Sequence, residues 1–448
     1  MTQRDIDGRR ARRVAWALFA GLVLVYNVNG REIGSFDSQP AKLTARELAV
    51  RGTLSLDHAV TERPGLGLRP GFARDRQGHV RSAYPLPSAL FAAIPATLLH
   101  RTGVIDMDAP LAPNLVAAAT ASILTALACT LIFLALLHQV TLAAALVTSI
   151  GLGLGTNYWA IASQTLWQHE SVAFGLALAL WAYLRDAAGI RPGHHVAAGL
   201  GLALGAAARP QIAVMVLMML AWVSIRTGRR SALIPAAAVL SAASAVTAAN
   251  LWWFGHPLGA VAGLEALHPE THGVSSSFGA PWAGAAGLLV SPSRGLLIFS
   301  PILLVALAGL GPALRTERHL RWLAGAAALQ FALYSSYSVW WAGHTYGPRY
   351  LLDILPPLAP FGAAGVDRLR SSRPARVVGT VLLAWSIGVA GLGALVYPND
   401  EWNTRPLEVD RHHERLWDAT DSQIRRAFDS GWSPQNFNLF GRDAIRRP

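Results

Sequence analysis

The chain has 448 residues, of which 52% are hydrophobic and only 14% are charged. Soluble proteins usually carry about a quarter charged residues, so this composition excludes an ordinary soluble domain and indicates a polytopic membrane protein. The net charge of +12 does not indicate nucleic-acid binding, because much of the arginine lies in short clusters between apolar segments. The single cysteine, Cys129, lies in an apolar run and excludes an internal disulfide.

The N-terminal residues 1–13 are rich in arginine, which places this end of the chain in the cytoplasm. The apolar stretch that follows, residues 14–28, has no small-residue cleavage site after it, so we expect a retained first span rather than a cleaved signal peptide. Residues 29–110 then form a long first outer loop.

We expect two helices in the membrane plane within this loop. Residues 40–50 predict the first, with Asp37 or Ser38 as its cap and Gly52 at its end. Residues 84–100 are ambiguous, because this segment of 17 residues contains three prolines. The later arginine-rich loops fall on the cytoplasmic side only if this segment does not cross, so we interpret it as a second in-plane helix.

The remaining apolar runs predict ten further spans, which gives eleven in a transmembrane domain of residues 14–397. These ten spans are 111–137, 141–157, 169–183, 197–208, 211–225, 231–250, 285–310, 322–340, 350–366 and 377–396. The polar tail, residues 398–448, then ends outside. Within it, residues 407–428 predict one amphipathic surface helix. The sequence shows no internal repeat, which argues against repeat-built transporter folds.

The first outer loop carries Glu32, Asp37 and the only lysine of the chain, Lys42. Asp37 follows the first span directly and precedes a helix at the membrane surface, so we interpret it as a catalytic carboxylate. Its alternative role is a helix N-cap, and the two roles can coexist. Glu32 is expected to support the loop or a metal.

A second candidate site lies at the start of the 169–183 span. No Asp, Glu, Lys or Arg occurs between Asp108 and Glu170, and His169 and Glu170 end this uncharged run. An ionisable pair at this depth is costly unless it faces a polar cavity. Simple interfacial placement, beside the belt residue Trp167, is the alternative.

Three arginines lie at or near the outer ends of spans, where short outer loops should be poor in arginine. They are Arg209, Arg294 and Arg349. Arginine binds phosphate with a planar fork of donors, so the three together favour a bound anion such as a lipid phosphate. Snorkelling to lipid headgroups is the alternative for each of them.

Four histidines lie in the outer loops, namely His256, His268, His272 and His344. Their spacing matches no metal-binding pattern, so we do not expect zinc there. The sequence has no Walker loop, no dinucleotide fingerprint after a strand and no nucleophile elbow. Cytosolic nucleotide chemistry is therefore not indicated.

The order of these features resembles the glycosyltransferase C (GT-C) superfamily, which includes protein O-mannosyltransferases and lipid A aminoarabinose transferases. The resemblance covers roughly residues 14–370. The matching motifs, in chain order, are Phe36-Asp37-Ser38, Tyr84-Pro85-Leu86-Pro87, Glu170, Ala208-Arg209-Pro210, SPSRGLLIFSP at 291–301 and YGPRYLLDILPPL at 346–358. Two departures stand out: Asp37 is alone where many members have an acidic pair, and the second site reads His-Glu.

The resemblance implies an enzyme of the cell (inner) membrane that moves a sugar from a polyprenyl-phosphate donor to an acceptor hydroxyl on the outer face. Asp37 would act as the general base. The substrate-binding candidates are Glu32, Lys42, His169, Glu170, Arg209, Arg294, His344, Tyr346 and Arg349. The departures leave metal dependence open: no cofactor is assigned, and a divalent metal stays an option.

The expected partners are the donor, membrane lipids and an unidentified glycan, lipid or protein acceptor, without nucleic acid. A transporter or flippase of a lipid-linked saccharide is the alternative from another class. A catalytically inactive scaffold is a third.

Overall fold

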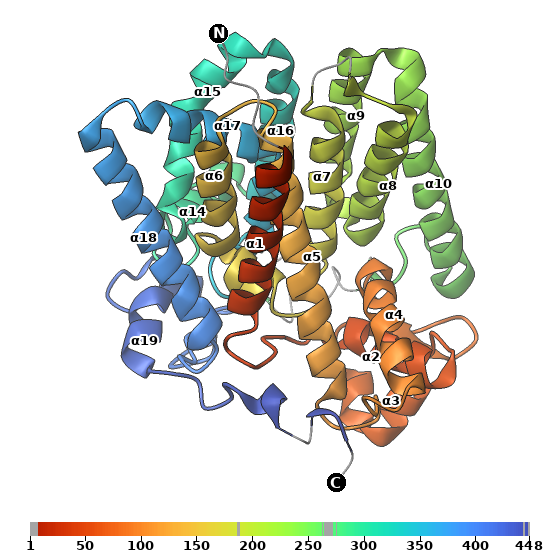
Figure 1. Ribbon diagram of the computed structural model, residues 1–448. Helices are drawn as coiled ribbons and strands as arrows, with labels where there is room; N and C mark the ends of the chain where they lie inside the picture. The colour runs from red at the N-terminus through yellow and green to blue at the C-terminus, as the bar shows by residue number, and fades with distance from the viewer. Residues whose placement is uncertain are drawn as a thin grey trace.

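The computed structural model shows an all-α protein, as the sequence predicts (Figure 1). It describes residues 8–185, 189–261, 263, 272–274, 276–441 and 444–446. Within these residues the only sheet is a short hairpin, in which β1 (Phe72–Arg74) pairs antiparallel with β2 (Val80–Ser82). Residues 1–7 and His268, on which parts of the sequence interpretation rest, lie outside the described residues.

Most of the predicted spans match one helix each. These helices are α1 (Gly8–Tyr26), α5 (Ala112–Leu136), α6 (Leu142–Leu154), α7 (His169–Tyr183), α8 (Pro192–Ala208), α9 (Ala213–Thr227), α10 (Arg229–Phe254), α16 (Arg321–Ser335), α17 (Leu355–Leu369) and α18 (Arg373–Leu395). Among the described residues, four helical segments are long and apolar enough to cross a membrane: Ala112–Leu136, Pro210–Thr227, Arg229–Phe254 and Arg373–Leu395. The chain is therefore a polytopic membrane protein.

The helices pack closely because small residues line their contacts. Gly175 of α7 and Gly201 of α8 illustrate this, since a Cβ added to Gly175 would lie 2.3 Å from the Gly201 carbonyl oxygen. Small side chains at such crossings allow two backbones to approach, which is typical of helix pairs in membranes. A larger residue at either position would separate α7 from α8.

The predicted single span 285–310 is wrong as one helix. The structure divides it into α13 (Pro281–Val290), α14 (Leu296–Phe299), the short 3-10 helix η5 (Pro301–Leu303) and α15 (Leu304–Thr316). Proline at 292 and 301 cannot continue the helical hydrogen-bond ladder. The polar residues between α13 and α14 form hydrogen bonds with the C-terminal tail instead.

The first outer loop forms a separate helical layer at the end of the molecule opposite the N-terminus (Figure 1). It contains α2 (Gln39–Arg51), α3 (Asp57–Glu62), the 3-10 helix η1 (Pro64–Leu68) and α4 (Pro87–Arg101). The predicted helices at 40–50 and 84–100 are therefore both present as helices. Gly52 ends α2 in the left-handed conformation at φ 66°, as predicted.

Helix α4 has one buried and one exposed face. Ala89, Ala92 and Ala96 are buried, and α4 packs against α2. The opposite face exposes a stripe of large apolar side chains at four-residue spacing: Leu90, Ile94 and Leu98. A helix with this pattern suits the membrane interface, and α4 is not among the helices long enough to span.

The C-terminal tail lies at the same end as the first outer loop (Figure 1). The predicted surface helix 407–428 is wrong, because the described part of the tail forms three short helices instead: η8 (His413–Trp417), α19 (Gln423–Ser430) and η9 (Asn438–Phe440). Asp418 breaks the run, since its Oδ1 accepts hydrogen bonds from the backbone N–H of Thr420 at 2.8 Å and of Asp421 at 3.2 Å. Such a side-chain turn competes with helix.

A buried arginine joins the first loop to the tail. Arg31 is 2% exposed. Its guanidinium donates to the carbonyls of Ala394 at 3.1 Å and Tyr397 at 2.6 Å, and to Ser433 Oγ at 3.1 Å. The beginning and the end of the chain therefore build one structural unit at this face.

This topology gives a direct prediction. We expect reporters fused after Arg101 and at the C-terminus to report the outside, and reporters fused at Arg229 and Ser372 to report the cytoplasm, because the arginine clusters stay cytoplasmic. Compartment-specific reporter activity in intact cells measures each position. A cytoplasmic signal at Arg101 would mean that α4 crosses the membrane.

Candidate functional site

Three distant segments meet at Asp37, which lies in the turn before α2. Tyr84 donates its hydroxyl to Asp37 Oδ1 at 2.8 Å. Arg349, which begins the 3-10 helix η7 (Arg349–Ile354), places Nη1 3.0 Å from Asp37 Oδ2. The Asp37 side chain is 39% exposed, so this carboxylate lies at the surface of the cluster and is in contact with solvent.

Asp37 does not cap α2. The N-cap position is Ser38, and neither its side chain nor another accepts a capping hydrogen bond. Ser38 Oγ instead donates to the carbonyl of Ser35 at 3.0 Å. The two oxygens of Asp37 bind Tyr84 and Arg349 rather than the first backbone N–H groups of α2. The geometry therefore disfavours a capping role for Asp37.

The electrostatics of the cluster keep Asp37 ionised. Burial by itself raises the pKa of Asp37, but the charge of Arg349 and the hydrogen bond from Tyr84 lower it further than burial raises it. The net pKa therefore lies below the usual value for aspartate. Desolvation and the neighbouring Asp37 raise the pKa of Tyr84, which keeps that hydroxyl a donor.

Arg349 is fixed by aromatic rings as well as by Asp37. Its guanidinium lies 4.9 Å from the ring centroid of Trp167 and 5.9 Å from that of Tyr350. Its Nε is buried and has no hydrogen-bond partner. A buried donor without a partner is uncommon in folded proteins, so the donors of this guanidinium are not all used among the described residues.

Glu32 and Lys42 form a second pair close to the Asp37 turn. Lys42 Nζ lies 2.9 Å from Glu32 Oε2 and 2.8 Å from Asn114 Oδ1, and Thr165 donates to Glu32 Oε1 at 2.6 Å. A Cβ added at Gly34 would lie 2.3 Å from Glu32 Oε1. The pair joins the first loop to α5 and to the segment before α7.

His169 and Arg209 meet on Asp353, a residue that the sequence analysis did not select. His169 Nδ1 lies 2.8 Å from Asp353 Oδ1, and Arg209 Nε lies 3.0 Å from Oδ2. Tyr334 also donates to Oδ2 at 2.5 Å. Asp353 is 1% exposed and follows Arg349 by four residues on η7.

The remaining predicted residues lie elsewhere. Glu170 is fully buried, and its Oε1 accepts a hydrogen bond from the Ser171 hydroxyl at 3.3 Å. Tyr346 is buried and donates to the carbonyl of Val389 on α18 at 2.9 Å. His344 is directed toward Glu408 and Asp410 of the tail.

In the structure, Arg294 lies in surroundings that differ from those of Arg349. It is fully buried, and all three of its guanidinium nitrogens donate to protein acceptors. Two of these acceptors belong to the tail: Gln423 Oε1 at 2.7 Å and Asn403 Oδ1 at 2.7 Å. With its donors used in this way, Arg294 anchors the tail, and we assign it no part in anion binding below.

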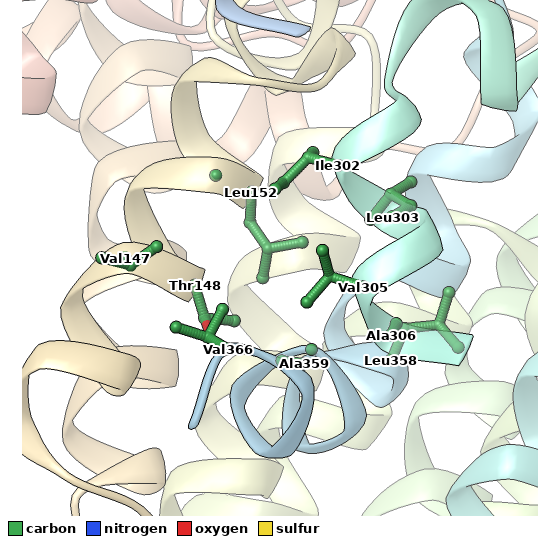
Figure 2. Close-up of a pocket in the computed structure, with 12 residues that line it drawn as sticks. Val147, Thr148, Leu152, Ile302, Leu303, Val305, Ala306, Leu358, Ala359 and Val366 are labelled. Atoms are coloured by element: carbon green, nitrogen blue, oxygen red, sulfur yellow. The ribbon is translucent and has the colours of Figure 1, made fainter. Parts of the chain in front are cut away.

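An apolar cavity lies between α6, η5, α15 and α17 (Figure 2). Thr148 is the only one of its 12 lining residues with a polar side chain. Leu358 and Ala359, on its α17 side, follow η7 by about one helical turn. The cavity is therefore connected through one helix to the segment that carries Arg349 and Asp353.

Comparisons with known proteins give little further information. No family model matches the chain, and no curated protein matches it. Among solved structures, the chain is similar to the crystal structure of ArnT from Cupriavidus metallidurans bound to undecaprenyl phosphate, at 13% sequence identity and a TM-score of 0.49. That alignment covers 97% of this chain and 77% of the ArnT chain.

Proposed function

We propose that this chain is a GT-C-type membrane glycosyltransferase that moves a sugar from a polyprenyl-phosphate donor to an acceptor hydroxyl. The observation that carries the proposal is the partly exposed carboxylate of Asp37, held by Tyr84 and by an arginine with an unused donor. A base and an anion-binding group stand side by side at the expected outer end of the helices, as this reaction requires.

The reaction assigns a role to each group. The acceptor hydroxyl oxygen forms a bond to the anomeric carbon, while the bond from that carbon to the donor phosphate oxygen breaks. Asp37 takes the hydroxyl proton as general base. The leaving polyprenyl phosphate gains negative charge, which Arg349 stabilises with its planar donors.

The ion pair also links donor binding to the strength of the base. Asp37 paired with Arg349 has a lowered pKa and is a weak base. A donor phosphate competes with Asp37 for the same guanidinium, and a carboxylate that shares its cation accepts a proton more readily. Donor binding thus raises the basicity of Asp37 when the acceptor arrives.

The prenyl chain of the donor would lie against apolar helices such as α17, which also lines the small cavity of Figure 2. A hydrocarbon tail that lies along α17 would run toward η7, where Arg349 would meet the phosphate. Glu32, Lys42, His169, Glu170 and Arg209 surround this region as supports of the loop and of η7. The sugar and the acceptor stay unassigned.

Arg349 provides the test of donor binding. We expect Arg349→Ala to weaken binding of polyprenyl phosphate by roughly 10- to 100-fold, since a hydrogen bond to a charged group contributes about 1.5–3 kcal/mol. Arg349→Lys should lose less, because it keeps the charge but not the fork. Binding to purified protein in nanodiscs measures both.

Arg81 offers a matched control. It pairs with Asp75 at 2.6 Å and lies 4.6 Å from the Trp253 ring, so it resembles Arg349 in its contacts, but its partners belong to the β-hairpin region and to α10. Arg81→Ala should leave binding of polyprenyl phosphate unchanged. Equal affinity in wild type and Arg349→Ala would remove the phosphate role of Arg349.

A further inference from the structure

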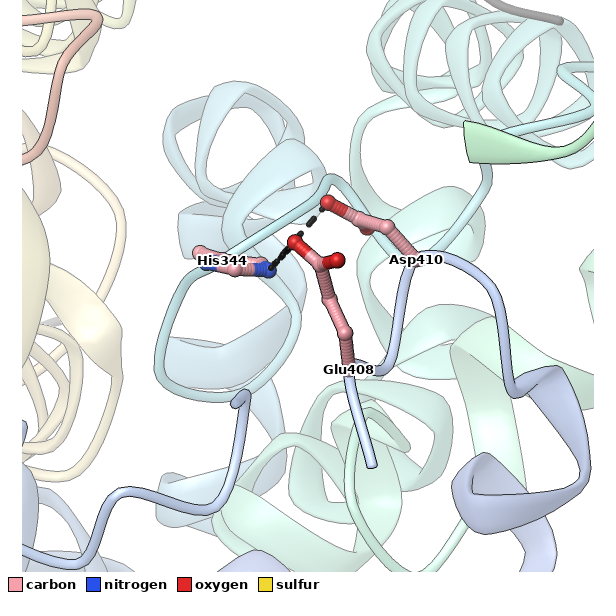
Figure 3. Close-up of side chains that lie close together, drawn as sticks. All are labelled: His344, Glu408 and Asp410. Carbon is pink, nitrogen blue, oxygen red and sulfur yellow. Dashed lines mark ion pairs between the residues drawn. The ribbon is translucent and has the colours of Figure 1, made fainter. Parts of the chain in front are cut away.

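A late loop and the C-terminal tail bring three metal-ligand side chains together: His344, Glu408 and Asp410 (Figure 3). His344 Nε2 lies 3.5 Å from Glu408 Oε1 and 3.3 Å from Asp410 Oδ2. The three donor atoms all lie within 4.8 Å of one another. His344 precedes the two acids by 64 and 66 positions in the sequence, so no short spacing motif indicates this cluster.

The possible metal-ligand atoms of these three side chains face one another, but His344 Nε2 forms no hydrogen bond with either carboxylate. His344 Nε2 is a buried atom that has no hydrogen-bond partner, although both carboxylates are near. Asp410 is 8% exposed, and its Oδ1 accepts from Trp341 Nε1 at 2.7 Å. This bond turns Oδ2 toward His344 and toward His272, whose Nε2 is 3.8 Å away. An outer partner that orients a ligating carboxylate is typical of metal sites.

The two distances from His344 are compatible with a tetrahedral ion shared by the three side chains. Zinc binds imidazole nitrogen and carboxylate oxygen at about 2.0–2.2 Å, so two ligands of a tetrahedral site lie about 3.3–3.6 Å apart. The two contacts of His344, at 3.3 and 3.5 Å, fall in this range. Two carboxylates that face the same point also repel each other, and a cation between them removes this cost.

We propose that His344, Glu408 and Asp410 bind a divalent cation, for which this imidazole–carboxylate set favours Zn²⁺. His272 or water completes the coordination. The bound ion ties the tail to the loop that continues into Arg349. The proposal does not depend on the glycosyltransferase assignment.

Metal content tests the proposal directly. The full-length protein is purified without a polyhistidine tag, stripped with a chelator, incubated with ZnCl₂ or MnCl₂ and desalted, and bound metal is measured by mass spectrometry. We expect wild type to retain about one Zn²⁺ per chain. Glu408→Gln and Asp410→Asn should weaken zinc binding by more than the roughly 10- to 100-fold that loss of an outer partner costs.

Two features make the test decisive. Glu408 is half exposed, so Glu408→Gln should fold normally, which melting of the stripped protein verifies. His412 pairs with Glu414 at 3.0 Å on the exposed part of the same tail, and His412→Ala is the matched control that should retain zinc. Zinc should also raise the melting temperature of wild type and of His412→Ala, but not that of Asp410→Asn.

The contrary results are equally clear. Zinc content that is equal in wild type, Glu408→Gln and Asp410→Asn would overturn the site. No zinc on wild type would leave a plain His–carboxylate ion pair, and retention of Mn²⁺ alone would overturn the zinc assignment. None of these results depends on turnover, so failure of the metal site and failure of the proposed function are distinguishable.

Discussion

Asp37→Asn should abolish most of the turnover of a polyprenyl-phosphate sugar while the protein stays folded. Asparagine preserves the size of the side chain and can still accept the hydrogen bond from Tyr84, but it cannot take a proton. A positioned general base typically contributes roughly 10²–10⁴-fold to the rate, and we expect a loss of that order. Turnover by purified protein in lipid, beside its melting temperature, measures the effect.

Asp57 provides the control for this experiment. It lies in the same outer loop, its side chain is 44% exposed against 39% for Asp37, and it pairs with His79 at 2.7 Å. Asp57→Asn should leave turnover near wild type. If Asp37→Asn also keeps near-normal turnover, then Asp37 is not the base; unchanged lipid-linked saccharide transport in that variant would favour the flippase alternative.

Asp353→Ala should destabilise the protein more than other single substitutions discussed above. Asp353 is almost fully buried and is the carboxylate partner of Arg209, whose side chain is 9% exposed. Removing one member of a buried ion pair leaves an uncompensated charge and costs about 3–5 kcal/mol. We expect a lower melting temperature and a smaller folded fraction in detergent.

A second variant distinguishes lost charge balance from lost packing. Replacing both members of the ion pair by apolar residues, as in Asp353→Leu with Arg209→Met, should recover part of the stability, because a buried pair can often be exchanged for apolar groups, although His169 and Tyr334 still lose their acceptor. Asp367 on α17 is the control, since its side chain is 32% exposed, and Asp367→Ala should shift stability by no more than about 0.5 kcal/mol. A loss for Asp353→Ala no larger than this control would contradict the prediction.

The helices were predictable where apolar runs end at polar residues. The span 169–183 coincides with α7, and the helix at 40–50 differs from α2 by one residue at each end. The prediction of one span over residues 285–310 was wrong because the segment is apolar almost throughout, while prolines and the buried Arg294 interrupt the helix. Hydropathy averages over such breaks and cannot locate them.

The site was predictable only as single residues, not as pairs. Asp37 and Arg349 were both selected, yet nothing local indicates that residues 312 positions apart form an ion pair. Arg294 and Arg349 have similar Gly- and Pro-containing surroundings, and only the acceptors Gln423 and Asn403 distinguish them. Asp353 escaped notice because it lies inside an apolar run, where a carboxylate needs partners from distant helices.

The Arg31 contacts have a consequence for biosynthesis. Arg31 leaves the ribosome early, whereas its partners Ala394, Tyr397 and Ser433 follow 363 to 402 residues later. Protein synthesis adds roughly 5–20 residues per second, so the acceptors of the Arg31 guanidinium are synthesised roughly 20–80 s after Arg31 itself. The hydrogen bonds that join the first outer loop to the tail can therefore form only after the last helix and the tail have been synthesised.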